Sequence, residues 1–127
     1  MTPNKNIIRT ASLLGAIAVI LGAMGAHALK GSIEASSLES YITAVRYQMW
    51  HSLALLFLAI LGDQIGPSKW VYRLWTLGII FFSGSIYALS LDELIHQNFS
   101  FLGPITPLGG LLLIAGWIVL FINTLRK

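Results

Sequence analysis

A small set of polar residues interrupts the long apolar runs of this sequence and could do chemistry there. His27 lies near the end of the first run, Gln48 and His51 lie one helical turn apart in the second, and Tyr87 lies near the end of the third. Imidazoles can bind a metal, carry a proton or hydrogen-bond a ligand. The candidate ligand-binding residues, or polar cluster, are His27, Gln48, His51, Ser83, Ser85, Tyr87 and Thr106.

This polar set allows several interpretations. Buried polar groups could simply hydrogen-bond one another, because an unpaired polar group in lipid costs several kcal/mol. The set could instead line a pocket for a small or quinone-like ligand, or form a pH-sensitive gate. A metal site is a weaker alternative, because two imidazoles without a carboxylate or thiolate are too few ligands for zinc or copper.

The composition indicates that the elements carrying these residues lie in a membrane. Hydrophobic residues make up 56% of the 127 residues and charged residues only 10%, whereas soluble domains carry about 25% charged residues. The net charge of +3 comes from scattered Lys and Arg without a basic run, so we expect no nucleic-acid partner. The absence of cysteine excludes disulfides and thiolate chemistry.

Four uncharged stretches predict an all-α bundle of four transmembrane helices in a single integral membrane domain, residues 1–127. The expected spans are approximately 8–29, 46–62, 72–91 and 107–125. The second stretch is short, but Ser36 and Glu39 form a capping-box pattern that predicts an earlier start. We therefore expect a long second helix that lies partly in the membrane interface. Thr106 is expected to be the N-cap of the last helix, with Pro107 at its first position.

Charge placement predicts the orientation of the chain. Six basic residues flank one side of the spans, whereas the other side carries two basic and four acidic residues, so both termini should face the cytoplasm. An inner and an outer aromatic belt are expected, while Trp117 lies too deep for a belt and should pack against a helix. The inner belt is Trp70, Tyr72 and Trp75; the outer belt is Tyr41, Tyr47, Trp50 and Tyr87.

The first apolar run has one competing interpretation. Lys5 and Arg9, the run itself and the sequence Ala26-His27-Ala28 together resemble a signal peptide with its cleavage site. The run is longer than the 7–15 apolar residues that are typical of signal peptides. We therefore expect it to form the first transmembrane helix.

Small residues at helical spacing predict close helix packing, because lipid-embedded helices associate through close contact and polar groups. They would serve contacts within a tight four-helix bundle or, alternatively, a dimerisation face. The helix-packing candidates are Gly15, Ala18, Gly22, Ala26, Gly84, Ala88, Gly109 and Gly116.

Several functional classes are not expected. No Asp, Glu, Lys or Arg lies in the interior of a span, since Arg9, Arg46 and Arg73 stand at span ends, although proton and ion carriers usually need a charge in the interior. Glu93 and His96 match one Glu-x-x-His motif, but the carboxylate-bundle metal site requires two such motifs with further glutamates, so we expect a solvated turn. No nucleophile with an adjacent base is evident. We expect no enzymatic activity, no metal and no cofactor.

Four short motifs occur in a specific order: Gly22-Ala-Met-Gly-Ala-His27, Tyr47-Gln48 with His51, Phe82-Ser-Gly-Ser-Ile-Tyr87, and Thr106-Pro-Leu-Gly-Gly110 with Gly116-Trp117. Together they resemble domain-of-unknown-function family 423, the YgdD-like and small transmembrane protein 256-like membrane proteins. The resemblance covers roughly residues 15–117. It implies a four-helix integral membrane protein and supplies no catalytic assignment.

The sequence therefore predicts a small, non-enzymatic accessory or binding subunit, located in the bacterial cytoplasmic (inner) membrane. Its expected partners are membrane lipid and a larger membrane protein complex or further copies of the same chain. The alternative is an oligomeric transporter or channel for a small solute or ion.

Overall fold

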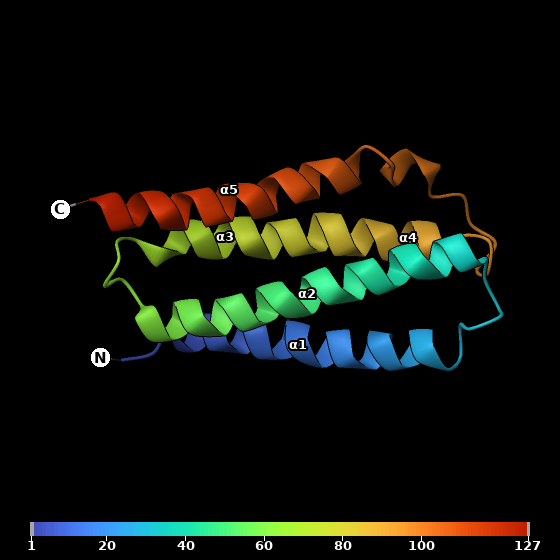
Figure 1. The fold of residues 1–127 in the computed structure, drawn as a ribbon, viewed down its shortest axis with the longest axis horizontal. Helices are drawn as coiled ribbons and strands as arrows, with labels where there is room; N and C mark the ends of the chain where they lie inside the picture. Colours follow the sequence, from blue (N-terminus) through green and yellow to red (C-terminus); the bar gives the residue numbers. More distant parts are fainter. Residues whose placement is uncertain (1, 127) are drawn as a thin grey trace.

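The computed structural model describes residues 2–126, which form helices and no extended sheet. Within these residues four helical units are long and apolar enough to cross a membrane, which confirms the predicted all-α four-span fold. The third unit is a continuous rod in which a π-helical turn separates two α-helices (Figure 1). In chain order the elements are α1 Lys5–Ala26, α2 Ala35–Leu61, α3 Ser68–Ile79, η1 Ile80–Gly84, α4 Ser85–Leu91, η2 Ser100–Leu102 and α5 Ile105–Leu125.

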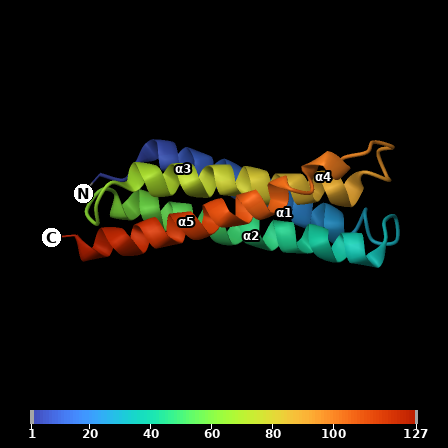
Figure 2. The same ribbon diagram turned by 90° about the horizontal axis from the view of Figure 1, so that it is seen from above.

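The helices run antiparallel along one long axis (Figures 1 and 2). Both termini lie at the end of the bundle that we call the termini end; the loops that follow α1 and α4 lie at the opposite end. Helix α2 packs between α1 and the α3–α4 rod, and the other side of that rod packs against α5. Both termini thus share one side of the membrane, and their cytoplasmic placement stays a prediction.

Helix α2 is 27 residues long, but it does not begin with the predicted capping box. Glu34 is the N-cap, no side chain caps the helix, and the backbone N–H of Leu38 already donates to the Glu34 carbonyl at 2.9 Å. Ser36 therefore lies inside the first turn. The capping-box prediction was wrong because Glu34 already has the extended backbone of an N-cap two residues earlier.

The start of α5 was also mispredicted. The helix begins at Ile105 after Pro104, so Thr106 is not the N-cap and Pro107 occupies the third helical position. Proline is tolerated there because the first four backbone N–H groups of a helix have no partner within it. Thr106 uses its hydroxyl elsewhere, in a hydrogen bond to Ser85.

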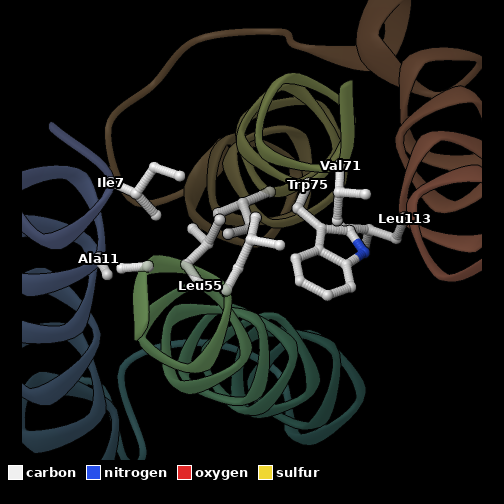
Figure 3. Packing of buried hydrophobic residues seen from close by; sticks show 9 residues of the cluster. Ile7, Ala11, Leu55, Val71, Trp75 and Leu113 are labelled. Atoms are coloured by element: carbon white, nitrogen blue, oxygen red, sulfur yellow. The ribbon is translucent and has the colours of Figure 1, made fainter. Parts of the chain in front are cut away.

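The hydrophobic core joins α1, α2, α3 and α5 around the Trp75 indole (Figure 3). Trp75 is 1% exposed and Tyr41 is fully buried, so neither belongs to the aromatic belt predicted for it. Large apolar side chains point outward instead: Phe57 and Leu125 are 69% and 65% exposed. An apolar outer surface combined with buried polar residues requires lipid as the surrounding solvent. The chain is an integral membrane protein.

Two of the predicted packing glycines set the closest helix contacts. A methyl group at Gly109 would overlap the backbone of Phe82, and one at Gly116 would overlap the Trp75 indole. Gly78 performs the same role from α3, because a methyl group there would lie 2.6 Å from Leu113. These contacts let α5 pack closely on the α3–α4 rod.

The other predicted packing residues behave differently from one another. Gly22 and Gly15 face Val45 and Ser52, where an added methyl group would lie 3.3 and 3.9 Å from the nearest side-chain atom. Ala18 is buried and Ala88 is half-buried, whereas Ala26 is exposed. Gly84 is exposed and has open space where a side chain would be.

Candidate functional site

Gln48 lies at the centre of a hydrogen-bonded network and is 3% exposed. Its Nε2 donates to the backbone carbonyl of Leu14 on α1 at 2.7 Å. Its Oε1 accepts from the hydroxyl of Tyr87 on α4 at 2.6 Å. The amide therefore joins three helices through one side chain, with one of its two N–H groups donating and its oxygen accepting.

Two further bonds tie α2 to its neighbours. The hydroxyl of Tyr41 donates to the Leu21 carbonyl of α1 at 2.6 Å. The hydroxyl of Ser83 donates to the Ala44 carbonyl at 2.8 Å. Ser83 lies in the π-helical turn, a feature that is frequent at functional sites. The network thus spans both faces of α2.

A separate hydroxyl pair joins α4 and α5. The Ser85 and Thr106 hydroxyl oxygens lie 2.6 Å apart, and Ser85 also donates to the Phe82 carbonyl at 3.1 Å. A hydroxyl has one hydrogen to donate. If Ser85 donates to Phe82, Thr106 is the donor to Ser85, and both groups are satisfied.

His51 belongs to an aromatic group at the middle of the bundle. Its Nδ1 lies 2.8 Å from the Tyr47 carbonyl, and its Nε2 lies 3.0 Å from the indole Nε1 of Trp117. A carbonyl can only accept and an indole N–H can only donate. The geometry therefore requires a neutral imidazole with its proton on Nδ1. Both ring nitrogens are engaged by the protein.

This arrangement bears on the interpretations left open by the sequence. Because the His51 nitrogens are occupied, no lone pair of this residue is free to bind a metal, and among residues 2–126 no group of three His, Asp or Glu side chains could hold one. Gln48 and Tyr87 bond each other directly, which leaves no ligand between them. The geometry favours a structural network.

His27 lies apart from the other predicted cluster residues. It is the C-cap of α1 and is exposed. Gly15 faces Ser52 beside His51, and twelve residues of helix place His27 about 18 Å further along α1. The two histidines therefore do not share a site. The Glu93–His96 segment is the exposed turn that was predicted.

An apolar cavity of about 370 Å³ opens beside His51, along what we call the α2–α5 seam. Its wall is aliphatic apart from three indoles and the phenyl ring of Phe57. Trp75 forms part of the wall and packs against Trp117, with 4.6 Å between the ring centroids. The lining residues are Trp50, Leu53, Ala54, Phe57, Leu58, Leu61, Trp75, Trp117 and Leu120.

Sequence reasoning missed several polar contacts. Trp117 was expected to pack against a helix, but not to hydrogen-bond His51. At the termini end, the Thr10 and Tyr72 hydroxyl oxygens lie 2.6 Å apart, and Asn123 Nδ2 donates to the Pro67 carbonyl at 3.3 Å. The predicted polar set included none of these residues. An asparagine near a span end can signal such a contact, but a tryptophan is a weak signal, because the buried Trp75 N–H has no partner among residues 2–126.

Comparison with known proteins places the chain in a family. The family described as "Protein of unknown function (DUF423)" matches residues 21–110. The UPF0382 membrane protein YwdK of Bacillus subtilis is 41% identical, with 90% of this chain and 94% of the relative covered. A UPF0382 membrane protein of Staphylococcus aureus is 42% identical over 96% of this chain and 97% of the relative.

The UPF0382 inner membrane protein YgdD of Escherichia coli is 37% identical, with 91% of this chain and 86% of the relative covered. No solved structure matches the chain significantly. The chain belongs to the DUF423 family of membrane proteins of unknown function, as the order of its motifs predicts.

Proposed function

We propose that this member of the DUF423 family is a non-enzymatic lipid-binding protein of the bacterial cytoplasmic membrane, in which the α2–α5 seam holds the acyl chain of one membrane lipid. The membrane assignment follows the name of its relative in Escherichia coli, an inner membrane protein. The observation that carries the proposal is the apolar cavity of about 370 Å³ between α2, α3 and α5.

The seam forms because of the position in which α5 packs. Gly116 lets the α5 backbone reach the Trp75 indole, so α5 packs closely on α3 and has far less contact with α2. Trp75 then forms one wall of the remaining gap, and Trp117 lies against it. The hydrogen bond to His51 holds Trp117 in place. A rigid apolar wall suits a hydrocarbon chain, because an apolar ligand loses little when it enters a preformed site.

The same contacts argue against conduction through a single chain, whereas the alternative function was an oligomeric transporter or channel. His51 is neutral and bonded at both nitrogens, and the Tyr47 and Phe82 rings pack 4.9 Å apart beside it. A pore through one chain would have to break these contacts. The apolar wall also offers no group that could replace the water around an ion.

The experiment is native mass spectrometry of the protein purified in mild detergent, comparing wild type with Ala54→Phe, which places a ring in the seam. We expect wild type to retain one phospholipid per chain, and Ala54→Phe to lose most of it. The matched control is Ala16→Phe, because Ala16 is exposed on α1 away from the seam. A wild-type protein without lipid, or equal retention by folded Ala54→Phe, would overturn the proposal.

A further inference from the structure

A second cavity, of about 410 Å³, lies at the opposite end of the bundle between α2, α4 and α5. It differs from the apolar cavity in that six hydroxyl-bearing residues line it, with two aliphatic side chains and no charged group. The lining residues are Ser36, Ser37, Ser40, Thr43, Ile86, Leu89, Ser90 and Thr106.

Ser90 is the residue that points to a ligand. It is 6% exposed and lines this cavity. Nearby hydroxyls are engaged within the protein: Ser83 bonds the Ala44 carbonyl, and Ser85 bonds Thr106. The Ser90 hydroxyl, in contrast, forms no hydrogen bond with another group among residues 2–126. The Ser90 oxygen stays accessible from the cavity, because the fully enclosed polar side-chain atoms without a partner among the described residues are Trp75 Nε1 and Thr76 Oγ1. A ligand in the cavity would supply the missing partner.

A third cavity, of about 300 Å³, adjoins the hydroxyl-lined one, because Ser37 and Ser90 line both. Three carboxylates, those of Glu34, Asp92 and Glu93, line this outer cavity. They give its mouth a negative potential that favours a cationic group. They are not a metal site, because no three acidic or histidine side chains among residues 2–126 could hold a metal ion together.

The hydroxyl-lined cavity and the apolar cavity lie along the same faces of α2 and α5. Thr43 lines the first and Trp50 the second, seven residues apart on α2, which is about 10 Å along one face. On α5, Thr106 and Trp117 are eleven residues apart, or close to three full turns. One elongated molecule could therefore contact both cavities.

Carboxylates, hydroxyls and an apolar wall thus succeed one another from the bundle end inward. A phospholipid with an amine in its headgroup presents its parts in the same order: ammonium, phosphate and ester oxygens, and acyl chain. We propose that the cavities at the opposite end bind the headgroup of an aminophospholipid, with its ammonium at Glu34, Asp92 and Glu93 and a phosphate or ester oxygen at Ser90. This inference rests on the proposed lipid-binding function and names the lipid class.

The test uses full-length protein reconstituted in phosphatidylcholine nanodiscs that contain equal amounts of phosphatidylethanolamine and phosphatidylglycerol. Lipids retained after extraction are then counted by native mass spectrometry. Since a charge-assisted hydrogen bond is worth about 1.5–3 kcal/mol, we expect phosphatidylethanolamine to exceed phosphatidylglycerol by about tenfold or more. The double variant Asp92→Asn/Glu93→Gln should lose most of this preference, and Ser90→Ala should weaken phosphatidylethanolamine retention severalfold.

The matched control is Glu39→Gln, because Glu39 is an exposed carboxylate that lines neither cavity. Its headgroup preference should equal that of wild type. Thermal melting of each variant after removal of lipid checks the fold, and Ser90→Ala should then melt close to the wild-type temperature because no hydrogen bond within the protein is lost. If wild type retains lipid without a headgroup preference, the inference fails while the lipid-binding function stands. If it retains no lipid, both fail.

Discussion

The indole N–H of Trp117 donates to the Nε2 of His51 across 3.0 Å, and this bond fixes the chemistry of the histidine. Because Nδ1 lies 2.8 Å from the Tyr47 carbonyl, it must carry the imidazole proton. In a protonated imidazole Nε2 would also carry a hydrogen, so the Nε2–H of His51 and the indole N–H of Trp117 would both be donors and could not bond each other. The bond therefore makes His51 a structural acceptor that orients Trp117, a wall residue of the α2–α5 seam in which we propose that lipid binds.

Replacing Trp117 by phenylalanine removes the donor and leaves Nε2 of His51 without a partner. We expect a loss of about 0.6–1.7 kcal/mol of stability, the range measured for side-chain hydrogen bonds in membranes. Denaturant titration in mixed micelles measures it. Trp50→Phe is the control. Trp50 is 55% exposed, and its indole N–H forms no hydrogen bond with another side chain among residues 2–126. Equal stability of both variants would show that the hydrogen bond contributes nothing.

The bond between Tyr87 and Gln48 should appear as a coupling energy. Tyr87→Phe leaves the Gln48 Oε1 without its donor, and Gln48→Leu leaves the tyrosine hydroxyl without its acceptor. A double-mutant cycle should give a favourable coupling of about 0.5–2 kcal/mol. Additive effects of the two substitutions would mean that the groups do not interact in the folded protein.

The packing of α5 on the α3–α4 rod should tolerate no methyl group at Gly109. In Gly109→Ala the new methyl group would overlap the Phe82 backbone, so we expect a loss of about 1–3 kcal/mol or more from overpacking. Gly84→Ala is the matched control because that position has open space, and it should be neutral or stabilising by up to about 1 kcal/mol through helix propensity. Thermal melting in detergent compares them, and a reversed order would contradict the packing.

The start of α3 should depend on pH through Asp63, which lies in the loop before it. The Asp63 carboxylate accepts hydrogen bonds from the backbone N–H and the hydroxyl of Ser68, at 2.9 and 2.8 Å, and these bonds hold its pKa below the ordinary value. Its contribution to the helix start is therefore complete above the ordinary carboxyl pKa, about 3.9. The contribution is lost as the pH falls through the lower pKa of the folded state.

Amide hydrogen exchange at Ser68, corrected for the intrinsic pH dependence, measures this effect. Protection should decline below about pH 4 in wild type and should be low at every pH in Asp63→Ala. The backbone N–H of Gly62, which donates to the Leu58 carbonyl at the end of α2, provides an internal reference. A parallel loss at both positions would point to global unfolding and contradict a local role of Asp63.

The sequence allowed the four spans to be predicted, because charge and hydropathy alone determine which segments can enter lipid. The sequence also put Gln48, Ser83 and Tyr87 in one set, because each lies in the outer half of its predicted span, and the structure brings them into one network around α2. Depth does not determine the direction in which a side chain points. His27 was assigned to the same set on depth, yet it lies exposed at the end of α1.

The seven-residue spacing along α2 indicates which residues are buried better than the aromatic residue type does. Tyr41, Gln48 and Leu55 are seven residues apart and all buried, as expected for one helix face. Tyr41 was nevertheless predicted to lie in the outer belt because tyrosines favour the interface. Its hydroxyl instead reaches the Leu21 carbonyl inside the bundle. The partner of Trp117 could not be predicted, because it depends on how α5 is seated against α2.

The most direct test of the central claim is a crystal structure of the protein grown in a lipid phase, with density inspected in two places. We predict acyl-chain density in the seam beside Trp75 and Trp117, and no non-protein density between Gln48 and Tyr87, which hydrogen-bond directly. A seam closed by side chains, or a ligand lying between Gln48 and Tyr87, would contradict the account.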